Sequence, residues 1–334
     1  MRIRSVDASA EPFALARPYT IAFRTVSSVQ IGVVRLATDD GLVGYGTASP
    51  EAHVTGETDA MCAAALEPDA LGWLVGRDAR ALPALVRELE RRMPKTPAAR
   101  AAVDIALHDL LAKKLGVPLV EMLGRAHDAL PTSITVGIKP TAEALEEDLE
   151  RVRALRERFG ERVGIRVDAN QGWSRQDAFA FFERARGLGV ELVEQPMAAR
   201  DVPAMRALPE EARRRVAADE SLLTERDALD LVAPPRACGI FNIKLMKCGG
   251  VAPALGIANV ARLAGVELMW GCMDESCISI AAALHAALAS PATRYLDLDG
   301  SFDLGRDVAR GGFVLEDGLM RTTEGAGLGV EPIE

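Results

Sequence analysis

Several kinds of residue that mark particular classes of protein are scarce in this sequence. Aromatic side chains make up 4% of the 334 residues, and the five cysteines are an odd number without any Cys-x-x-Cys pair. No histidine lies near them to complete a zinc site. The cysteines therefore indicate reduced thiols in a cytoplasmic protein, and they argue against a disulfide framework or a structural zinc ion.

Charge and hydropathy remove further classes of function. The chain is acidic, with a net charge of -9 and a pI near 5.2, and it has no block of Lys and Arg. The sequence therefore offers no positively charged cluster that would attract a phosphate backbone or an anionic membrane surface. We predict neither nucleic acid nor membrane as a partner. No apolar stretch approaches the roughly 20 residues of a membrane span, and the N-terminus carries no signal-peptide run.

The composition is otherwise that of a globular protein, with 49% hydrophobic and 26% charged residues. In the first third, alternating runs at 29–37 and 42–48 flank Asp39-Asp40-Gly41, a pattern typical of a β-hairpin. Ala- and Leu-rich patterns then predict helices near 58–74, 82–93 and 97–115. We expect residues 1–129 to form an α+β domain.

From about residue 130 the pattern alternates between short β-rich runs and helical stretches. The runs are 134–138, 163–168, 190–194, 216–219, 240–244, 266–271 and 295–299. Measured at Asp168, Glu194, Asp219, Lys244, Gly271 and Asp297, they recur every 25 to 27 residues. One strand, one helix and two loops need about this length, so the repeat predicts a (β/α)₈ barrel over 130–310, followed by a C-terminal segment at 311–334 that returns to the first domain.

One interval breaks this repeat. Ile138 and Asp168 are 30 residues apart, and a single helical pattern at 145–159, ending at Gly160, fills the space between them. Only seven strands are then visible where barrel closure requires eight. Either the barrel is unusual or a segment of about 20 residues is missing between Thr141 and Glu147. We favour a missing segment, because a seven-stranded remnant would expose barrel edges and leave a void.

Acidic residues end three successive predicted strands: Asp168 in VDAN, Glu194 in VEQP and Asp219 in AADES. The C-terminal ends of barrel strands converge on one mouth, where active sites lie. Three clustered carboxylates repel one another unless a cation is present, and their hard oxygen atoms suit Mg²⁺. The alternative is a set of unrelated, solvated loop acids.

The remaining strand ends carry further candidate groups. Lys244, within NIKLMKCGG, is a candidate proton acceptor if a nearby metal lowers its pKa; otherwise it is an ion-pair partner for one of the acids. Asp297 and Asp299 lie two residues apart, so both point to the same face of their strand. That pair could hold a substrate ammonium group or a second metal ion.

The motifs VDANQGW, VEQP, ADES, NIKLMKCGG, GCM and YLDLDG occur in this order over nearly the whole chain. In this respect the sequence resembles the muconate-lactonizing subgroup of the enolase superfamily, and most of all its dipeptide epimerases, including those acting on Ala-Glu. The resemblance implies a modified barrel covered by an N-terminal α+β capping domain. It also implies a dipeptide substrate, and often an octamer or smaller homo-oligomer.

The resemblance assigns roles to individual residues. Asp168, Glu194 and Asp219 would bind Mg²⁺, and Lys244 would be the base on one face of the α-carbon. Asp297 and Asp299 would hold the dipeptide ammonium group, with Cys272 and Met273 of GCM also lining the substrate site. Arg24, in the capping loop, resembles an arginine that binds acidic side chains. Such a site would abstract an α-proton and stabilise the resulting enediolate with the metal.

The sequence also departs from this family. The second base should come from a Lys-x-Lys motif at the end of the second barrel strand, and no such motif lies between Ile138 and Asp168. The motif would fall within the segment that the strand spacing indicates is missing. Four alternatives stay open: a cycloisomerase, an o-succinylbenzoate-synthase-like lyase, an N-acyl amino acid racemase, and a non-catalytic binding protein if the deletion is real.

Overall fold

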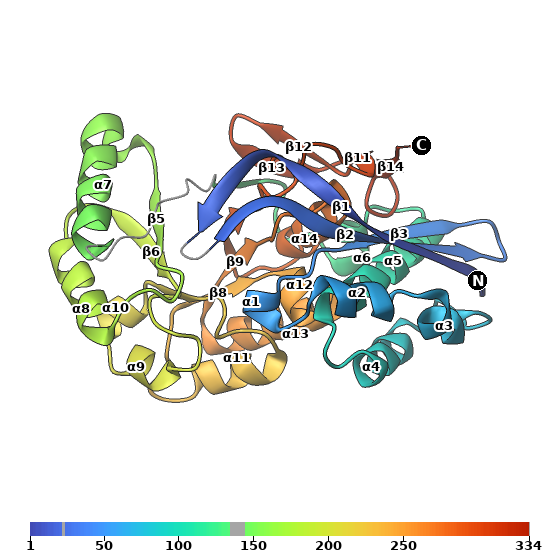
Figure 1. Ribbon diagram of the computed structural model, residues 1–334, viewed down its shortest axis with the longest axis horizontal. Coiled ribbons are helices and arrows are strands. Elements are labelled where there is room, and N and C mark those ends of the chain that lie inside the picture. Colours follow the sequence, from blue (N-terminus) through green and yellow to red (C-terminus); the bar gives the residue numbers. More distant parts are fainter. Residues whose placement is uncertain (22–23, 134–143, 334) are drawn as a thin grey trace.

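The computed structural model describes residues 1–21, 24–133 and 144–333. Its N-terminal region contains an antiparallel sheet of β1 (Ile3–Ile21), β2 (Arg24–Thr38) and β3 (Val43–Ala48), in that order. The hairpin between β2 and β3 is confirmed, with the predicted turn at Asp39 to Gly41. In Figure 1 the long ribbons of β1 and β2 extend from this region toward the barrel strands.

Neither β1 nor a break within the first helix was predicted from the sequence. The helices and turn that follow the sheet are α1 (Ala52–Thr55), α2 (Asp59–Ala65), α3 (Pro68–Leu71), η1 (Gly72–Leu74), α4 (Leu82–Arg92), α5 (Pro97–Leu115) and α6 (Leu119–Leu123). The helix expected over 58–74 is interrupted because Pro68 has no N–H for the preceding turn and instead begins α3. The helix expected over 97–115 is confirmed as α5.

Helix α5 packs directly against β3. A Cβ atom at Gly46 would lie 1.9 Å from the carbonyl oxygen of Ala102, and one at Gly44 would lie 2.3 Å from that of Ala106. Only glycine permits this backbone approach. Most side chains of α5 are buried, so this helix forms the centre of the hydrophobic core between the sheet and the barrel.

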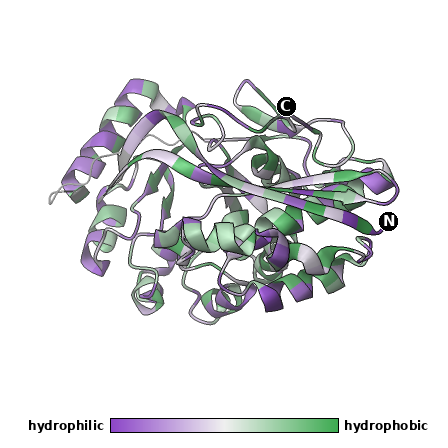
Figure 2. Ribbon diagram, turned by 45° about the vertical axis from the view of Figure 1, so that its right-hand side comes forward, coloured by the Kyte–Doolittle hydropathy of each residue, from purple (hydrophilic) through white to green (hydrophobic). Residues whose placement is uncertain are grey.

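The described part of the barrel region contains six parallel strands in the order β10-β9-β8-β7-β6-β5. They are β5 (Ile165–Asp168), β6 (Val190–Glu194), β7 (Val216–Ala218), β8 (Ile240–Ile243), β9 (Glu267–Gly271) and β10 (Thr293–Asp297). The helices are α7 (Ala144–Phe159), α8 (Arg175–Arg184), α9 (Val202–Arg206), α10 (Glu210–Arg213), α11 (Glu225–Val232), α12 (Leu245–Cys248), α13 (Val251–Ala264) and α14 (Cys277–Leu288), with η2 (Gly160–Arg162) after α7. Figure 2 shows hydrophilic residues on the outer helices and hydrophobic ones where elements meet.

The strand interiors form layers that explain the position of the mouth. A separate cluster fills the lower layer with one side chain from each of five strands: Leu192, Ala217, Ile240, Met269 and Tyr295. Because side chains alternate between the two faces of a strand, the next inward-facing position lies two residues further along. Two residues beyond the members of this apolar layer, on the same strands, lie the residues of the next layer, at the mouth: Glu194, Asp219, Asn242, Gly271 and Asp297.

The strand predicted at 134–138 lies outside the described residues, and β5 is at one end of the described parallel sheet. No strand in the described part of the chain pairs with the outer edge of β5. Arg166 of β5 instead reaches across, donating hydrogen bonds to Ser133 Oγ at 3.1 Å and to the Leu296 carbonyl at 2.8 Å. Near this edge, Leu155, Phe159 and Val163 are 42 to 48% exposed. The missing βα unit stays a prediction.

The C-terminal strands are β11 (Ala309–Gly311), β12 (Phe313–Glu316), β13 (Leu319–Thr322) and β14 (Val330–Pro332). β11 pairs with β14, and β12 pairs with β13, which pairs with β4 (Leu130–Pro131). The segment also contacts the N-terminal helices, since Leu119 N donates to the Gly327 carbonyl at 2.8 Å. The boundaries 1–129, 130–310 and 311–334 stay predictions. None of the described helices is both long and apolar enough to cross a membrane.

Candidate active site

The three predicted strand-end acids lie at neighbouring positions of the parallel sheet. Asp168 and Glu194 are direct register partners between β5 and β6. Glu194 pairs in register with Ala217 of β7, and Asp219 lies two residues beyond Ala217 on the same face. The structure therefore brings all three carboxylates to the barrel mouth.

The backbone is strained directly after two of these acids. Asn170 and Gln171 have φ angles of 43° and 65°, and Gln195 has a φ angle of 31°. Non-glycine residues rarely occupy this left-handed region, and such strain persists only where surrounding contacts hold it. At Gln195 these contacts are clear, because its side chain accepts hydrogen bonds from Asp219 N at 3.0 Å and Ser221 N at 3.1 Å.

The electrostatics of the mouth show mutual repulsion. Burial raises the pKa of Glu194 well above its usual value, and the charges of Asp168 and Asp219 raise it further. Asp168 keeps exposed surface on its open side, yet burial of the carboxyl and the charge of Asp219 raise its pKa too. Negative charge at these positions is therefore unfavourable unless a cation is added.

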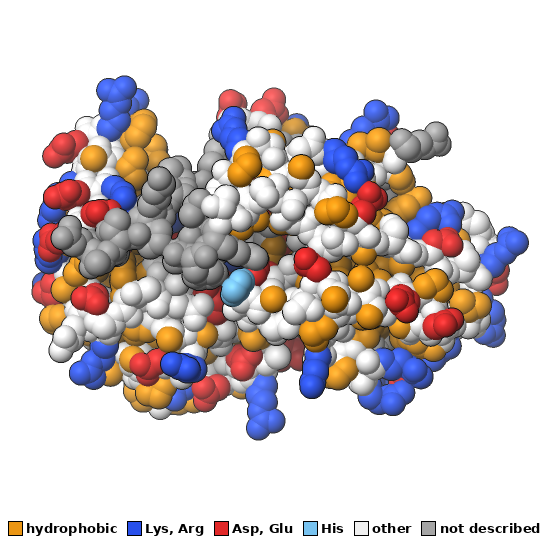
Figure 3. Space-filling model, in the orientation of Figure 1, with side chains coloured by type: hydrophobic (Ala, Val, Ile, Leu, Met, Phe, Trp, Pro, Cys, Tyr) orange, Lys and Arg blue, Asp and Glu red, His pale blue; other side chains and the backbone are white. Residues whose placement is uncertain are grey.

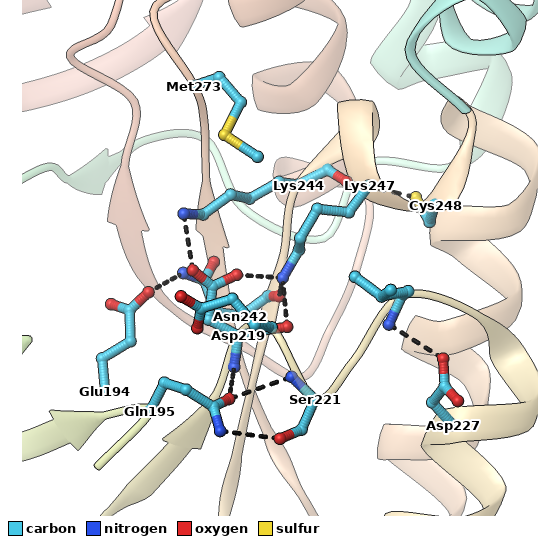
Figure 4. Close-up of polar contacts among 12 residues, drawn as sticks. Glu194, Gln195, Asp219, Ser221, Asp227, Asn242, Lys244, Lys247, Cys248 and Met273 are labelled. Carbon is cyan, nitrogen blue, oxygen red and sulfur yellow. Dashed lines mark hydrogen bonds and ion pairs between the residues drawn. The ribbon is translucent and has the colours of Figure 1, made fainter. Parts of the chain in front are cut away.

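Asp219 differs from the other two acids because it has two lysine partners. Lys244 Nζ lies 2.8 Å from Asp219 Oδ2, and Lys247 Nζ contacts Asp219 Oδ1. Burial would raise the pKa of Asp219, but the two ammonium charges outweigh it and lower the pKa. Figure 4 shows both lysine side chains directed at this carboxylate.

The ion pair that the sequence left open for Lys244 is present. Burial would lower the pKa of Lys244, but the charges of Asp219 and Glu194 raise it well above its usual value. The structure thus presents a protonated lysine at the mouth. The lowered pKa that a base requires is not found in this arrangement, and it depends on neutralising these acids with another cation.

Three further side chains complete this network and were missed from the sequence. The buried Asn242 donates its amide to Glu194 Oε1 at 2.6 Å, and Lys247 and Gln195 hold Asp219 from two sides. Asn242 precedes Lys244 by two residues, so strand alternation alone could have placed it on the same face. Lys247 lies on α12, one helical turn beyond β8, and its return toward Asp219 depends on tertiary structure.

Asp297 and Asp299 lie beside each other at the end of β10, as strand alternation predicts. Both are half-buried, whereas Leu298 between them is fully buried. Ser133 Oγ donates a hydrogen bond to Asp297 Oδ1. Cys272 lies close by: its Sγ is 3.3 Å from the Asp297 carbonyl and accepts a hydrogen bond from Gly300 N at 3.3 Å.

The loop after β9 connects this side of the mouth to the capping domain. Met273 N donates to Glu275 Oε1 at 2.8 Å, and burial raises the pKa of the Glu275 carboxyl to about 7. Tyr19 from β1 donates its hydroxyl to Asp274 Oδ2 at 2.8 Å. The side chain of Arg24 lies outside the described residues, so its implied role stays a prediction.

The donor chemistry of the mouth fits Mg²⁺. Three carboxylates on adjacent strand ends offer hard oxygen ligands. The pKa values of Glu194 and Asp168 are raised, and that of Asp219 is lowered only by two lysines, so the cluster favours added positive charge. Within the described residues, no three His, Cys, Asp or Glu side chains already stand in a metal-binding arrangement. Each carboxylate oxygen of Asp219 is instead turned to a lysine.

Two family matches together span nearly the whole chain. Residues 3–124 match the mandelate racemase/muconate lactonizing enzyme N-terminal domain, and residues 125–334 match the enolase C-terminal domain-like family. The chain belongs to the enolase superfamily. Within it, this protein is a member of the muconate lactonizing enzyme subgroup, as the strand-end motifs predicted.

Proteins similar to this superfamily member include two named L-Lys-D/L-Arg epimerase. The one from Methylococcus capsulatus is 57% identical over 99% of both chains, and the one from Desulforapulum autotrophicum is 51% identical over 100% of both. A solved structure of a dipeptide epimerase from M. capsulatus, complexed with Mg and the dipeptide L-Arg-D-Lys, has a TM-score of 0.95 at 57% identity, covering 99% of each chain.

One of these alignments contains more positions than this chain has residues. The alignment with the Desulforapulum protein spans 355 positions, whereas this chain has 334 residues. At least 21 positions of the alignment therefore have no counterpart in this chain. That number is close to the deficit of about 20 residues indicated by the strand spacing.

Proposed function

We propose that this protein catalyses the Mg²⁺-dependent epimerisation of dipeptides with basic side chains. The observation that supports this most directly is the layer of strand-end groups at the mouth, where Asp168, Glu194 and Asp219 adjoin Lys244. The names of the two relatives reported above agree with this chemistry.

Each group has a distinct part in this proposal. Asp168, Glu194 and Asp219 would hold the ion, which when bound supplies positive charge to the substrate carboxylate as negative charge develops on it. Lys244 removes or delivers the proton at one face of the α-carbon. Its present ion pair with Asp219 keeps it protonated and ready to deliver a proton, and it must lose that proton before it can accept one.

The substrate's N-terminal ammonium group is assigned to Asp297 and Asp299. Their half-buried position beside Cys272 and Met273 excludes part of the solvent, which strengthens an ammonium–carboxylate contact. This pair is also what favours a dipeptide over the cycloisomerase, lyase and N-acyl amino acid racemase alternatives, because substrates without a free ammonium group have no use for it.

Basic side chains are favoured by charge. Besides Asp297 and Asp299, which are assigned to the ammonium group, the loop after β9 carries Asp274 beside the mouth, and the whole chain has a net charge of -9. On the visible face in Figure 3, Lys and Arg are scattered and do not gather around the centre. The implied role of Arg24 as a partner for acidic side chains predicts the opposite preference, so a substrate comparison distinguishes the two.

A dipeptide library in D₂O with Mg²⁺ tests this function. We expect mass spectrometry to show deuterium at the α-carbon of Lys- and Arg-containing dipeptides, and no label when EDTA removes the ion. Label in Ala-Glu but not in basic dipeptides would support the Arg24 interpretation. Label only in N-acylated amino acids would support the racemase alternative, and no label in any substrate would refute the proposed activity.

The missing βα unit is part of the same proposal and has its own test. A chain that contains it should weigh about 2 kDa more than 35.7 kDa, because about 20 residues are needed to restore the repeat. With that extra mass, we expect a second lysine and full epimerisation. At 35.7 kDa, we expect Lys244 to exchange the α-proton of one stereoisomer without inverting it. Two-way epimerisation by a 35.7 kDa chain would contradict the two-base assignment.

A further inference from the structure

Lys247 is a buried cation whose hydrogen-bonding capacity is fully used. It is 2% exposed, on the short helix α12. Its ammonium group has three donors, and three acceptors surround it: Asp219 Oδ1, the Asp219 carbonyl at 2.7 Å and the Asn242 carbonyl at 2.9 Å. Lys247 is therefore anchored to the ends of both β7 and β8, and no donor remains for a substrate.

Lys244 makes a different kind of contact with the same carboxylate. Its side chain is 16% exposed, against 1% for that of Lys247, and its ammonium group lies 2.8 Å from Asp219 Oδ2. The two oxygens of Asp219 thus have unequal partners. Oδ1 faces a lysine that two backbone carbonyls also hold, and Oδ2 faces a lysine that borders the mouth (Figure 4).

The backbone of Asp219 is fixed from the opposite side as well. Gln195 is fully buried and accepts a hydrogen bond from Asp219 N at 3.0 Å, while Lys247 donates to the Asp219 carbonyl. The side-chain amide of Gln195 donates to Ser221 Oγ at 2.8 Å and to the Met197 carbonyl at 2.9 Å. With both backbone groups and Oδ1 held, Oδ2 is the part of Asp219 that can change partner.

We propose that Lys247 is a positioning residue that engages Oδ1 of Asp219 and leaves Oδ2 as the single oxygen which Asp219 presents to Mg²⁺. This inference rests on the proposed function, since it assumes that Asp219 is a ligand of the ion. In this arrangement Lys244 and the ion use the same oxygen, so ion binding requires Lys244 to leave Asp219 and turn toward the substrate.

A second possible role of Lys247 has an effect of opposite sign. A cation beside a metal ligand repels Mg²⁺, so a lysine that acted through charge alone would weaken binding, and its removal would tighten it. A lysine that orients the ligand improves binding, and its removal weakens it. Loss of partners that orient metal ligands reduces metal affinity or activity by roughly 10- to 100-fold.

The test compares K247M with wild type and with a matched control, K113M. Lys113 also joins a buried aspartate to a backbone carbonyl, contacting Asp109 at 2.7 Å and the Val43 carbonyl at 2.8 Å, but it lies in the capping domain. Calorimetric titration of the full chain with Mg²⁺ should show roughly 10- to 100-fold weaker binding for K247M. K113M should bind Mg²⁺ like wild type while losing thermal stability.

The outcomes separate the inference from the proposed function. Equal or tighter Mg²⁺ binding by folded K247M overturns the positioning role, whereas wild type that binds no Mg²⁺ overturns the metal site itself. If K247M does not fold, K247Q replaces it, because its amide keeps donors for the two backbone carbonyls but lacks the charge. Weaker binding by K247Q is expected, and unchanged binding overturns the inference.

Discussion

Buried carboxylates occur in two regions of this molecule and are stabilised in different ways. Around α5, the chain itself provides backbone donors for each acid. Glu57 accepts hydrogen bonds from Ala98 N at 2.6 Å and Ala99 N at 3.1 Å, at the N-terminal end of α5. Asp104 accepts from Val251 N and Ala252 N, at the start of α13. These acids connect helices through their N-terminal N–H groups.

In the barrel mouth the acids face one another. Burial raises the pKa of Glu57 and of Glu194, but only at Glu194 do other carboxylates, Asp168 and Asp219, raise it further. The same residue types therefore have two roles, and the partners distinguish them. An acid with backbone donors stabilises the fold, whereas the acids that repel one another at the mouth are the proposed site for an added cation.

The largest expected effect comes from neutralising one acid in each region. Glu194→Gln removes a ligand charge, so we expect turnover to be abolished and Mg²⁺ affinity to fall roughly 100-fold or more. Glu57→Gln should leave Mg²⁺ affinity unchanged but lower the free energy of unfolding by about 1 to 3 kcal/mol. Calorimetric titration and urea unfolding measure the two effects. Unchanged Mg²⁺ affinity in folded E194Q would remove Glu194 from the metal site.

A second prediction concerns the acids assigned to the substrate rather than to the ion. N-acetylation removes the ammonium charge that Asp297 and Asp299 are proposed to bind. We expect kcat/KM for an acetylated basic dipeptide to fall roughly 100-fold, equivalent to about 3 kcal/mol of charge-assisted hydrogen bonding. Steady-state kinetics on the matched pair of dipeptides measures this. Equal values for the two would shift the assignment toward an N-acyl amino acid racemase.

A third prediction extends the comparison to a buried base in the structural region. His285 Nδ1 accepts a hydrogen bond from Val120 N at 2.9 Å, and burial lowers the pKa of the ring to about 4. In the unfolded chain the His285 ring binds a proton near pH 6.5, whereas in the folded protein it does so only near pH 4. The contribution of the neutral ring to the free energy of unfolding is therefore complete above pH 6.5. That contribution, about 3 kcal/mol, is lost as the pH falls through about 4.

Urea unfolding of wild type and H285Q between pH 7 and pH 4 isolates that contribution. We expect the stability of wild type to fall more steeply with decreasing pH than that of H285Q. Parallel profiles for the two proteins would show that His285 is not held neutral in the folded state.

The smallest effect is expected where a carboxylate is satisfied at the surface. Glu88 pairs with Arg91 at 2.6 Å and Arg92 at 2.5 Å on the exposed side of α4. Solvent screens such pairs, so Glu88→Gln should change Tm by no more than about 1 °C. Differential scanning calorimetry tests this, and a decrease as large as that for E57Q would contradict the distinction between buried and exposed acids.

The sequence predicted the barrel strands better than the first domain, for identifiable reasons. Strand ends that recur every 25 to 27 residues, most of them at a polar residue, are a strong signal, and β6 was predicted with its observed bounds. In contrast, β1 contains Pro12 and Pro18 and is rich in Ala, which are weak strand signals. It forms because it is the edge strand of its sheet, where proline is tolerated.

The sequence by itself determined which acids lie at the mouth. Residues two apart on a strand share a face, so Asp168, Glu194 and Asp219 follow from the positions of the strand ends alone. The tertiary structure decided how those acids are held. Gln195 reaches Asp219 from the end of β6, and Lys247 reaches it from helix α12. The distances between these groups are set by the packing of β6, β7 and β8. Spacing along the chain does not predict such distances, because they depend on how neighbouring strands are paired and on where α12 begins.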